Sequence, residues 1–272
     1  MTKKMSMLVS ERCFLKCPGC YNEEKTGQPL SAEQNINFAK ILKKIGYKAI
    51  TLSGGDPLAR GDIKQIIQGI DELGFEINLD TTGIPLLDNE FDQPISAQEI
   101  SKTVDLIGIP LDGSNDEIIS KFRTKEGSTL VETEKILELL EKEGCRISIN
   151  TAVHSGNIDN LNEIYQIISK YPSVARWELH QFVSLDGGSK TNESQFSVTD
   201  DDFCQAVSRI ENNTDIVISP KPRQNKQNFS YLDFNGDFIK ITDGESHMLF
   251  NIKGMDEDGL LEAVLILEAQ SF

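Results

Sequence analysis

A unit made of an amphipathic helix, a glycine and a short apolar strand recurs along the first two thirds of the chain. In its first copy, Ser31 and Gln34 have the spacing of a capping box, and the apolar positions up to Leu42 fall on one side of a helix. Gly46 suits the left-handed residue that follows a helix end. Residues 49–52 are then short and apolar, so we predict a helix followed by a buried strand.

The same alternation continues along the chain. We predict further helices at 63–73, 130–143 and 161–170, and six strands in all, at 6–9, 49–52, 75–79, 106–111, 146–153 and 175–182. Strands that alternate with helices imply a parallel sheet with right-handed crossovers. The sequence therefore predicts an α/β fold, which we interpret as a partial (β/α)6 barrel. A doubly wound sheet is the alternative that periodicity does not separate from it.

The alternation ends near residue 183. Residues 184–198 are polar and glycine-rich and predict a loop, and a helix is expected near 200–210. Asn235-Gly236 between two apolar segments indicates a β-hairpin. We therefore predict a barrel core at residues 1–183 and a short α+β extension at 184–272, which caps the barrel mouth as part of the same structural unit.

Composition narrows the function classes. The chain has 272 residues, a net charge of −16, 38% hydrophobic residues and 26% charged residues, as expected for a folded globular protein. This acidic balance argues against a nucleic-acid partner, which requires a basic face. The sequence has no apolar stretch of membrane-spanning length, and its first residues are not expected to form a signal peptide. We expect a cytoplasmic protein without a membrane partner.

Three of the five cysteines, Cys13, Cys17 and Cys20, lie within eight residues directly after the first predicted strand. In a reducing compartment such crowding favours metal binding over disulfides. Three thiolates can hold three irons of a [4Fe–4S] cluster and leave the fourth iron open, whereas a ferredoxin cluster has four cysteine ligands. A zinc site completed by a distant ligand is the alternative. The spacing alone leaves both interpretations open.

A second motif, Gly54-Gly55-Asp56-Pro57, ends the second predicted strand. Together with the C-x3-C-x2-C loop it resembles the radical S-adenosylmethionine (SAM) superfamily, over about residues 5–183. The resemblance implies that the three cysteines bind one [4Fe–4S] cluster and that its open iron binds SAM. It also implies that residues 54–57 contact the methionine end of SAM, with Asp56 receiving the ammonium group.

The resemblance assigns SAM contacts to further strand ends. Thr82 lies in a turn similar to the Thr-Asn-Gly turn of the family, and Arg123 takes the position of an arginine that pairs with the SAM carboxylate. Asp112 or Asn150 would contact the ribose. Pro110 replaces a serine that is common in the family, so one hydroxyl group is lost at this site.

The adenine end shows a departure from the family. Gly19 occupies the position before the last cysteine, where an aromatic residue is usual, and Tyr21 follows that cysteine. The backbone of Gly19 could still read adenine. Gln181 and Phe182, at the end of the sixth strand, resemble the segment that borders adenine in relatives.

Such a protein would cleave SAM reductively to a 5′-deoxyadenosyl radical, which removes hydrogen from a substrate, with a flavodoxin or ferredoxin as electron donor. The cofactors carry this chemistry and the protein orients them. Cys145 and Cys204 are too isolated in sequence to bind a second cluster, and the tail lacks a cysteine-rich extension. We therefore expect a single cluster.

The substrate is the open question. Lys221, Arg223 and Lys226 could form a phosphate site or a solvated basic loop, and the tail loosely resembles viperin-like enzymes. We predict a small phosphorylated or nucleotide-like substrate, with His180 as the candidate catalytic residue. The alternatives are a ribosomally synthesised peptide substrate and a non-enzymatic metal-binding protein.

Overall fold

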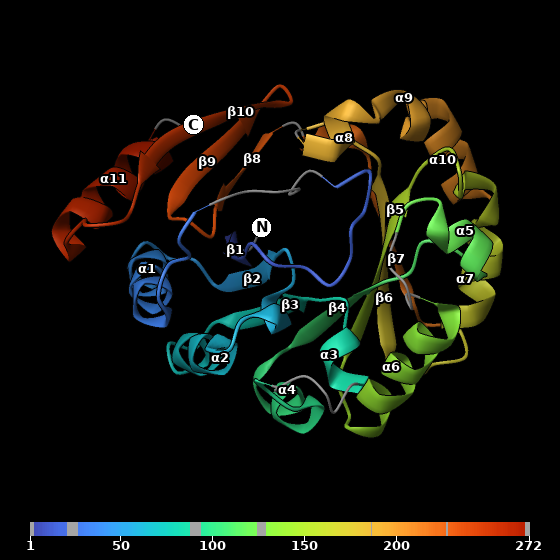
Figure 1. Cartoon of the computed structure of the whole chain (residues 1–272), viewed down its shortest axis with the longest axis horizontal. Helices are drawn as coiled ribbons and strands as arrows, with labels where there is room; N and C mark the ends of the chain where they lie inside the picture. The colour runs from blue at the N-terminus through green and yellow to red at the C-terminus, as the bar shows by residue number, and fades with distance from the viewer. Residues whose placement is uncertain are drawn as a thin grey trace.

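A curved sheet dominates the computed structural model, which describes residues 3–20, 27–87, 94–123, 129–185, 187–226 and 228–269. In that part of the chain the sheet has ten strands in the order β10-β9-β8-β1-β2-β3-β4-β5-β6-β7 (Figure 1). The strands are β1 (Lys4–Ser10), β2 (Ala49–Gly54), β3 (Glu76–Asp80), β4 (Leu106–Pro110), β5 (Ile147–Val153), β6 (Val174–Gln181), β7 (Val217–Lys221), β8 (Asn228–Leu232), β9 (Asp237–Thr242) and β10 (Glu245–Asn251).

Strands β1 to β6 pair in parallel in sequence order, and β7 and β8 extend the two edges of this core, also in parallel. Strands β8, β9 and β10 form an antiparallel meander. The predicted partial barrel with an α+β extension is therefore confirmed. The division between residues 183 and 184 stays a prediction, because strands on both sides of it share one sheet.

The longer helices cover the outer side of the curved sheet (Figure 1). They are α1 (Ala32–Lys44), α2 (Ile63–Asp71), α4 (Ala97–Thr103), α6 (Leu130–Lys142), α7 (Leu161–Ile168), α10 (Asp200–Ser208) and α11 (Glu257–Ala269). Ser31, Ser96 and Thr129 each close a capping box at the start of α1, α4 and α6. None of the described helices combines the length and apolar character that a membrane span requires.

The two faces of the sheet differ in polarity. Register partners in a parallel sheet project to the same face, and neighbours along a strand project to opposite faces. Ile50, Ile77 and Leu79 project toward the helices and are fully buried in the main core. Thr51 and Asn78 are register partners on the inner face. The inner face therefore carries polar side chains on β2 and β3, and it is the surface on which a ligand site can form.

The segment predicted as a loop at 184–198 differs from expectation. It contains two short helices, α8 (Gly187–Thr191) and α9 (Glu193–Phe196). These helices pack on the cysteine loop: the backbone N–H of Ser189 donates to the Cys20 carbonyl at 3.2 Å, and Asn192 Nδ2 donates to the Pro18 carbonyl at 2.7 Å. A polar, glycine-rich segment carries no local signal for contacts with a loop so distant in sequence.

The C-terminal extension contains an edge strand, β7, and the predicted β-hairpin. Strand β7 contains Pro220, which argues against a strand, but β7 is an edge strand and a proline is tolerated there. The predicted hairpin joins β8 to β9 through Asp233–Gly236, and the Asp233 N–H donates to the Asp237 carbonyl at 2.8 Å. The remaining short helices are α3 (Ile84–Leu87) and α5 (Asp116–Ser120), with single 3₁₀ turns at Pro57–Ala59, Ile158–Asn160 and Arg223–Lys226.

Candidate functional site

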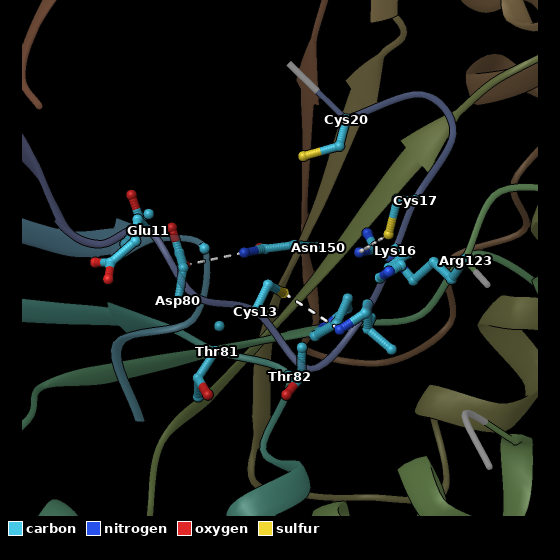
Figure 2. A pocket seen from close by; sticks show the side chains of 16 residues that line it. Glu11, Cys13, Lys16, Cys17, Cys20, Asp80, Thr81, Thr82, Arg123 and Asn150 are labelled. Carbon is cyan, nitrogen blue, oxygen red and sulfur yellow. Dashed lines mark hydrogen bonds between the residues drawn. The ribbon is translucent and has the colours of Figure 1, made fainter. Parts of the chain in front are cut away.

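The cysteine loop and the ends of the parallel strands enclose a cavity of about 480 Å³. Cys13, Cys17 and Cys20 all line it, together with the turns after β2 and β3 (Figure 2). The active sites of open α/β sheets lie at this carboxyl edge. Among the described residues, no group of three His, Cys, Asp or Glu side chains is arranged to hold one metal ion. Ligands of an iron–sulfur cluster bind different irons, so three cysteines around one cavity suit a cluster as a donor set.

The turn after β2 is bonded directly to the cysteine loop. The N–H of Gly55 donates to the Ser10 carbonyl at 2.7 Å, and the N–H of Asp56 donates to the Arg12 carbonyl at 2.6 Å. A Cβ atom on Gly55 would lie 2.2 Å from the Arg12 carbonyl oxygen, and one on Gly54 would lie 2.5 Å from that of Ser10. The two glycines therefore allow the two sequence motifs to pack backbone against backbone.

Asp56 is fully buried and organises this edge of the sheet rather than facing the cavity. Its Oδ1 accepts hydrogen bonds from the Leu58 N–H at 2.9 Å and Thr81 Oγ1 at 2.7 Å, and its Oδ2 accepts from the N–H and hydroxyl of Thr82 at 2.9 and 2.5 Å. Burial raises the pKa of Asp56, and the bonds from Thr82 and Thr81 act to lower it. Thr82 lines the cavity, as does the Gly54-Gly55 backbone, whereas the Pro57 side chain is buried in the turn.

Arg123 reaches the cavity beside Cys17, with its Nη1 3.9 Å from the Cys17 sulfur. Its Nε forms an ion pair with the fully buried carboxylate of Asp112, which also accepts from the Ala152 N–H at 2.7 Å. Burial acts to lower the pKa of Arg123, but the charge of Asp112 outweighs it and the pKa is raised. Burial also raises the pKa of Cys17 to about 11, so the free thiol is neutral. Asp112 is thus turned toward Arg123 and does not line the cavity.

A polar bridge crosses the inner face of the sheet from β3 to β5. Asn150 Nδ2 donates to Asp80 Oδ1 at 3.0 Å (Figure 2). Gly108 on β4 lies between them, and a Cβ atom there would lie 2.1 Å from Asp80 Oδ1 and 2.6 Å from Asn150 Nδ2. Burial, and secondarily the charge of Glu178, raise the pKa of Asp80 to about 6. Glycine is disfavoured inside strands, and here it makes room for the bridge.

A second cavity of about 430 Å³ adjoins the first along the inner face. The two cavities share Cys17, Cys20, Ser53, Asp80, Arg123 and Asn150 in their walls. Gly19 and Phe182 also line the second cavity, next to Phe122. A Cβ atom on Gly19 would lie 2.2 Å from the Phe122 ring, so Phe122 fills the space that an aromatic side chain at position 19 would need. Tyr21 lies outside the described residues.

The end of β6 projects two polar side chains into the barrel and one out of it. His180 lines the second cavity, and its Nε2 lies 3.3 Å from Glu178 Oε2. The side chain of Gln181 projects the other way, is fully buried, and donates to Asp200 Oδ1 at 2.8 Å. Gln181 therefore borders the cavity only at the end of β6, and its side chain is directed away from the cavity.

Of the three predicted phosphate-binding cations, the two with described side chains, Lys221 and Arg223, have different partners. Lys221 lies in the barrel with its Nζ 3.5 Å from Glu178 Oε1. Arg223 donates to Asp200 at 2.7 Å beside α10. Lys226 ends a 3₁₀ turn, and its side chain lies outside those that the structure describes. Each of the two described cations already has a carboxylate partner.

Sequence reasoning missed Asp80, Gly108 and Phe122 as site residues. Asp80 directly follows Leu79 at a strand end, which was an available signal. Gly108 in the middle of a predicted strand was a second available signal, because a glycine inside a strand often marks a place where another group approaches the backbone closely. Phe122 gave no signal, since its contact with Gly19 joins loops that are far apart in sequence.

Replacing Asp80 with asparagine is expected to stabilise the protein in a pH-dependent way. Asp80 has a pKa of about 6 in the folded chain against about 4 when unfolded. The folded state therefore binds more protons between these values, and stability falls as pH rises from 4 to 6. We expect Asp80→Asn to gain about 2 kcal/mol at pH 8 and nothing near pH 4. Urea unfolding at both pH values measures this, and an equal gain at both would contradict it.

Comparison with known proteins identifies the class. Residues 7–168 match the family model of the radical SAM superfamily. This is more than half of the chain, and the chain belongs to that superfamily of enzymes.

The individual proteins that resemble the chain have low sequence identity to it. An AdoMet-dependent heme synthase of Methanosarcina barkeri is 26% identical over 69% of the chain, and the chain spans only about half of that protein, 52%. Streptococcus suis SuiB bound to SAM has a TM-score of 0.70 at 13% identity, over 88% of this chain and 60% of SuiB. The AdoMet- and peptide-bound anSMEcpe has a TM-score of 0.70 at 17% identity, over 96% and 80% of the two chains. These structures share the fold.

Proposed function

We propose that the chain reductively cleaves SAM at one [4Fe–4S] cluster held by Cys13, Cys17 and Cys20, and that the resulting radical abstracts hydrogen from a substrate in the second cavity. The observation that carries this proposal is that all three cysteines and the Arg123 guanidinium line one cavity. When bound, the cluster supplies the electron that breaks a carbon–sulfur bond of SAM. Three cysteine ligands leave one iron open for the amino and carboxylate groups of SAM.

The chain's own residues orient SAM in this proposal. The backbone of Gly54 and Gly55, with Thr82, borders the methionine end, and Arg123 neutralises its carboxylate. Asp112 acts as a positioning residue, because its ion pair with Arg123 fixes the guanidinium beside Cys17. Asp56 likewise fixes the turn of Thr82 and does not receive the ammonium group directly.

The distal half of SAM would lie toward the second cavity. Asn150 is the ribose contact, and it lines both cavities. Gly19, Phe182 and Phe122 provide an apolar wall for adenine. Phe122 supplies the aromatic ring that position 19 lacks. Exclusion of water by this wall would protect a reactive radical from side reactions.

One cluster and an external electron donor complete the proposal. Cys145 is buried behind the sheet with its thiol toward the Ala97 carbonyl, and Cys204 is exposed on α10, so neither lines the cavity. The donor would be a flavodoxin or ferredoxin. Two substrate classes are compatible with the volume of the second cavity: a compact molecule, and one side chain of a peptide. A phosphorylated substrate is not part of the proposal, because Lys221 and Arg223 have carboxylate partners.

Anaerobic reconstitution with iron and sulfide, followed by electron paramagnetic resonance with and without SAM, tests the proposal. We expect a reduced [4Fe–4S] signal that changes on addition of SAM, and 5′-deoxyadenosine that accumulates with dithionite as reductant. A signal indifferent to SAM, without 5′-deoxyadenosine, would leave the three cysteines as ligands of a structural metal site.

A further inference from the structure

The second cavity has a polar floor whose hydrogen-bonding capacity is only partly used. Thr51 is 7% exposed, lines this cavity, and its Oγ1 has no hydrogen-bond partner among the described residues. Its register partner Asn78, also 7% exposed, has an Oδ1 without a described partner. A buried polar atom without a partner is costly, so native proteins seldom retain one without a ligand or water to satisfy it.

Asp80 adds a carboxylate to the same floor. It lies two residues beyond Asn78 on β3, hence on the same face, and it lines both cavities. Its Oδ1 accepts from Asn150, and no ion pair to Asp80 is present in the described part of the chain. Thr51 and Asp80 thus offer oxygen acceptors to the cavity, and the carboxylate offers a negative charge.

Charges on the neighbouring strands do not neutralise this carboxylate. Glu178 on β6 faces Asp80 with a like charge, and it is itself paired with Arg176, His180 and Lys221. Lys4 on β1 acts on Asp80 only through its longer-range charge. The cations on β6 and β7 are therefore directed at Glu178, and within the described part of the chain no cation forms an ion pair with Asp80.

The part of the cavity wall beside β1 and β8 is apolar. Leu8, Leu185, Phe229 and Tyr231 line it, and the rings of Phe229 and Tyr231 stack at 5.8 Å. A ligand that fits both sides has a compact hydrogen-bond donor with positive charge at one end and an apolar or aromatic body at the other. An ammonium group matches this floor, since it has three donors and no acceptor.

We propose that the second cavity binds the primary ammonium group of an amine-bearing substrate on Asp80 and Thr51, with the substrate's apolar body against Phe229 and Tyr231. This deepens the proposed function and rests on it for the statement that the bound amine is the molecule from which hydrogen is removed. Gly108 on β4 is part of the proposed site. Because it has no side chain, Asn150 can donate a hydrogen bond to Asp80 across this strand.

Binding of benzylamine to the reconstituted full chain tests this, with benzyl alcohol as the neutral probe of similar shape. Calorimetry in the presence of saturating S-adenosylhomocysteine should show at least tenfold tighter binding of benzylamine. Because a carboxyl group with a pKa of about 6 is about one-tenth ionised at pH 5, affinity should be about tenfold lower at pH 5 than at pH 8. Equal affinity for the two probes, or displacement of benzylamine by S-adenosylhomocysteine, would overturn the proposal.

Asp80→Asn keeps an acceptor for Asn150 and removes only the charge, so it should abolish both the preference for benzylamine and its pH dependence. Asp201→Asn, an exposed change on α10, is the matched control and should keep both. A pH dependence that persists in Asp80→Asn would assign it to a different group and refute the role of Asp80. A wild-type chain that forms 5′-deoxyadenosine but shows no amine preference refutes only this inference. An amine preference without 5′-deoxyadenosine refutes the proposed function instead.

Discussion

Cys17→Ala should leave a folded protein that no longer assembles an intact cluster or forms 5′-deoxyadenosine above background. Cys17 lines the cavity at 3.9 Å from Arg123, so its loss removes one of three iron ligands and the thiolate nearest the guanidinium. Because the metal-free thiol is neutral and only half-buried, the cost to folding should be only about 1 kcal/mol. Iron and sulfide content, the visible absorption of the reconstituted protein and 5′-deoxyadenosine formation measure the effect.

Cys204→Ala is the matched control for this variant. Cys204 is an exposed cysteine on α10 and lies outside both cavities. It should retain the iron content and 5′-deoxyadenosine formation of the wild type. If both variants lost the cluster equally, or if Cys17→Ala kept an intact SAM-responsive one, the assignment of the three cysteines would be wrong.

Gly55→Ala should produce the largest loss of stability among single methyl additions at the site. The new Cβ would lie 2.2 Å from the Arg12 carbonyl oxygen, which belongs to the backbone and cannot rotate away. The turn must then separate from the cysteine loop and lose the hydrogen bonds from Gly55 and Asp56 to Ser10 and Arg12. We expect about 2–4 kcal/mol of destabilisation in urea unfolding. In the folded fraction, 5′-deoxyadenosine formation should fall about 100-fold, because the cysteine loop is displaced.

Gly61→Ala separates this effect from a general intolerance of alanine. Position 61 has no atom within 4 Å of a new Cβ, so the change should alter stability by less than about 0.5 kcal/mol. Similar losses in both variants would show that the close packing of residues 54–55 on residues 10–12 is not what makes glycine necessary.

Local sequence determined much of the barrel. The capping box at Ser31 and the period of the apolar residues predicted α1, recurrence of the same unit predicted α6, and the buried strands followed from their apolar runs. These signals act within one or two turns of chain, so they can be read without knowledge of the fold. The pairing of the cysteine motif with residues 54–57 was predictable as well, because carboxyl ends of neighbouring parallel strands meet at one edge.

Side-chain directions inside the site required the tertiary structure. Asp56 and Asp112 were expected to contact SAM, but each accepts hydrogen bonds or an ion pair from the chain itself and lies outside the cavity walls. Lys221 and Arg223 were grouped by sequence spacing, yet they project to different partners, Glu178 and Asp200. Spacing along a segment reports neighbours in the chain, while the partner of a charge is set by whichever element packs against it.

The class of protein could thus be predicted from the sequence alone, because short motifs at strand ends carry that chemistry locally, and Cys13, Cys17 and Cys20 remain the predicted cluster ligands. Only the tertiary structure decided that Phe122 fills the space beside Gly19, that Asp80 and Asn150 meet over Gly108, and that the second cavity has an acidic floor. Each of these joins segments between about 30 and 100 residues apart in the chain. Such contacts follow from the curvature and register of the sheet, which no local pattern specifies.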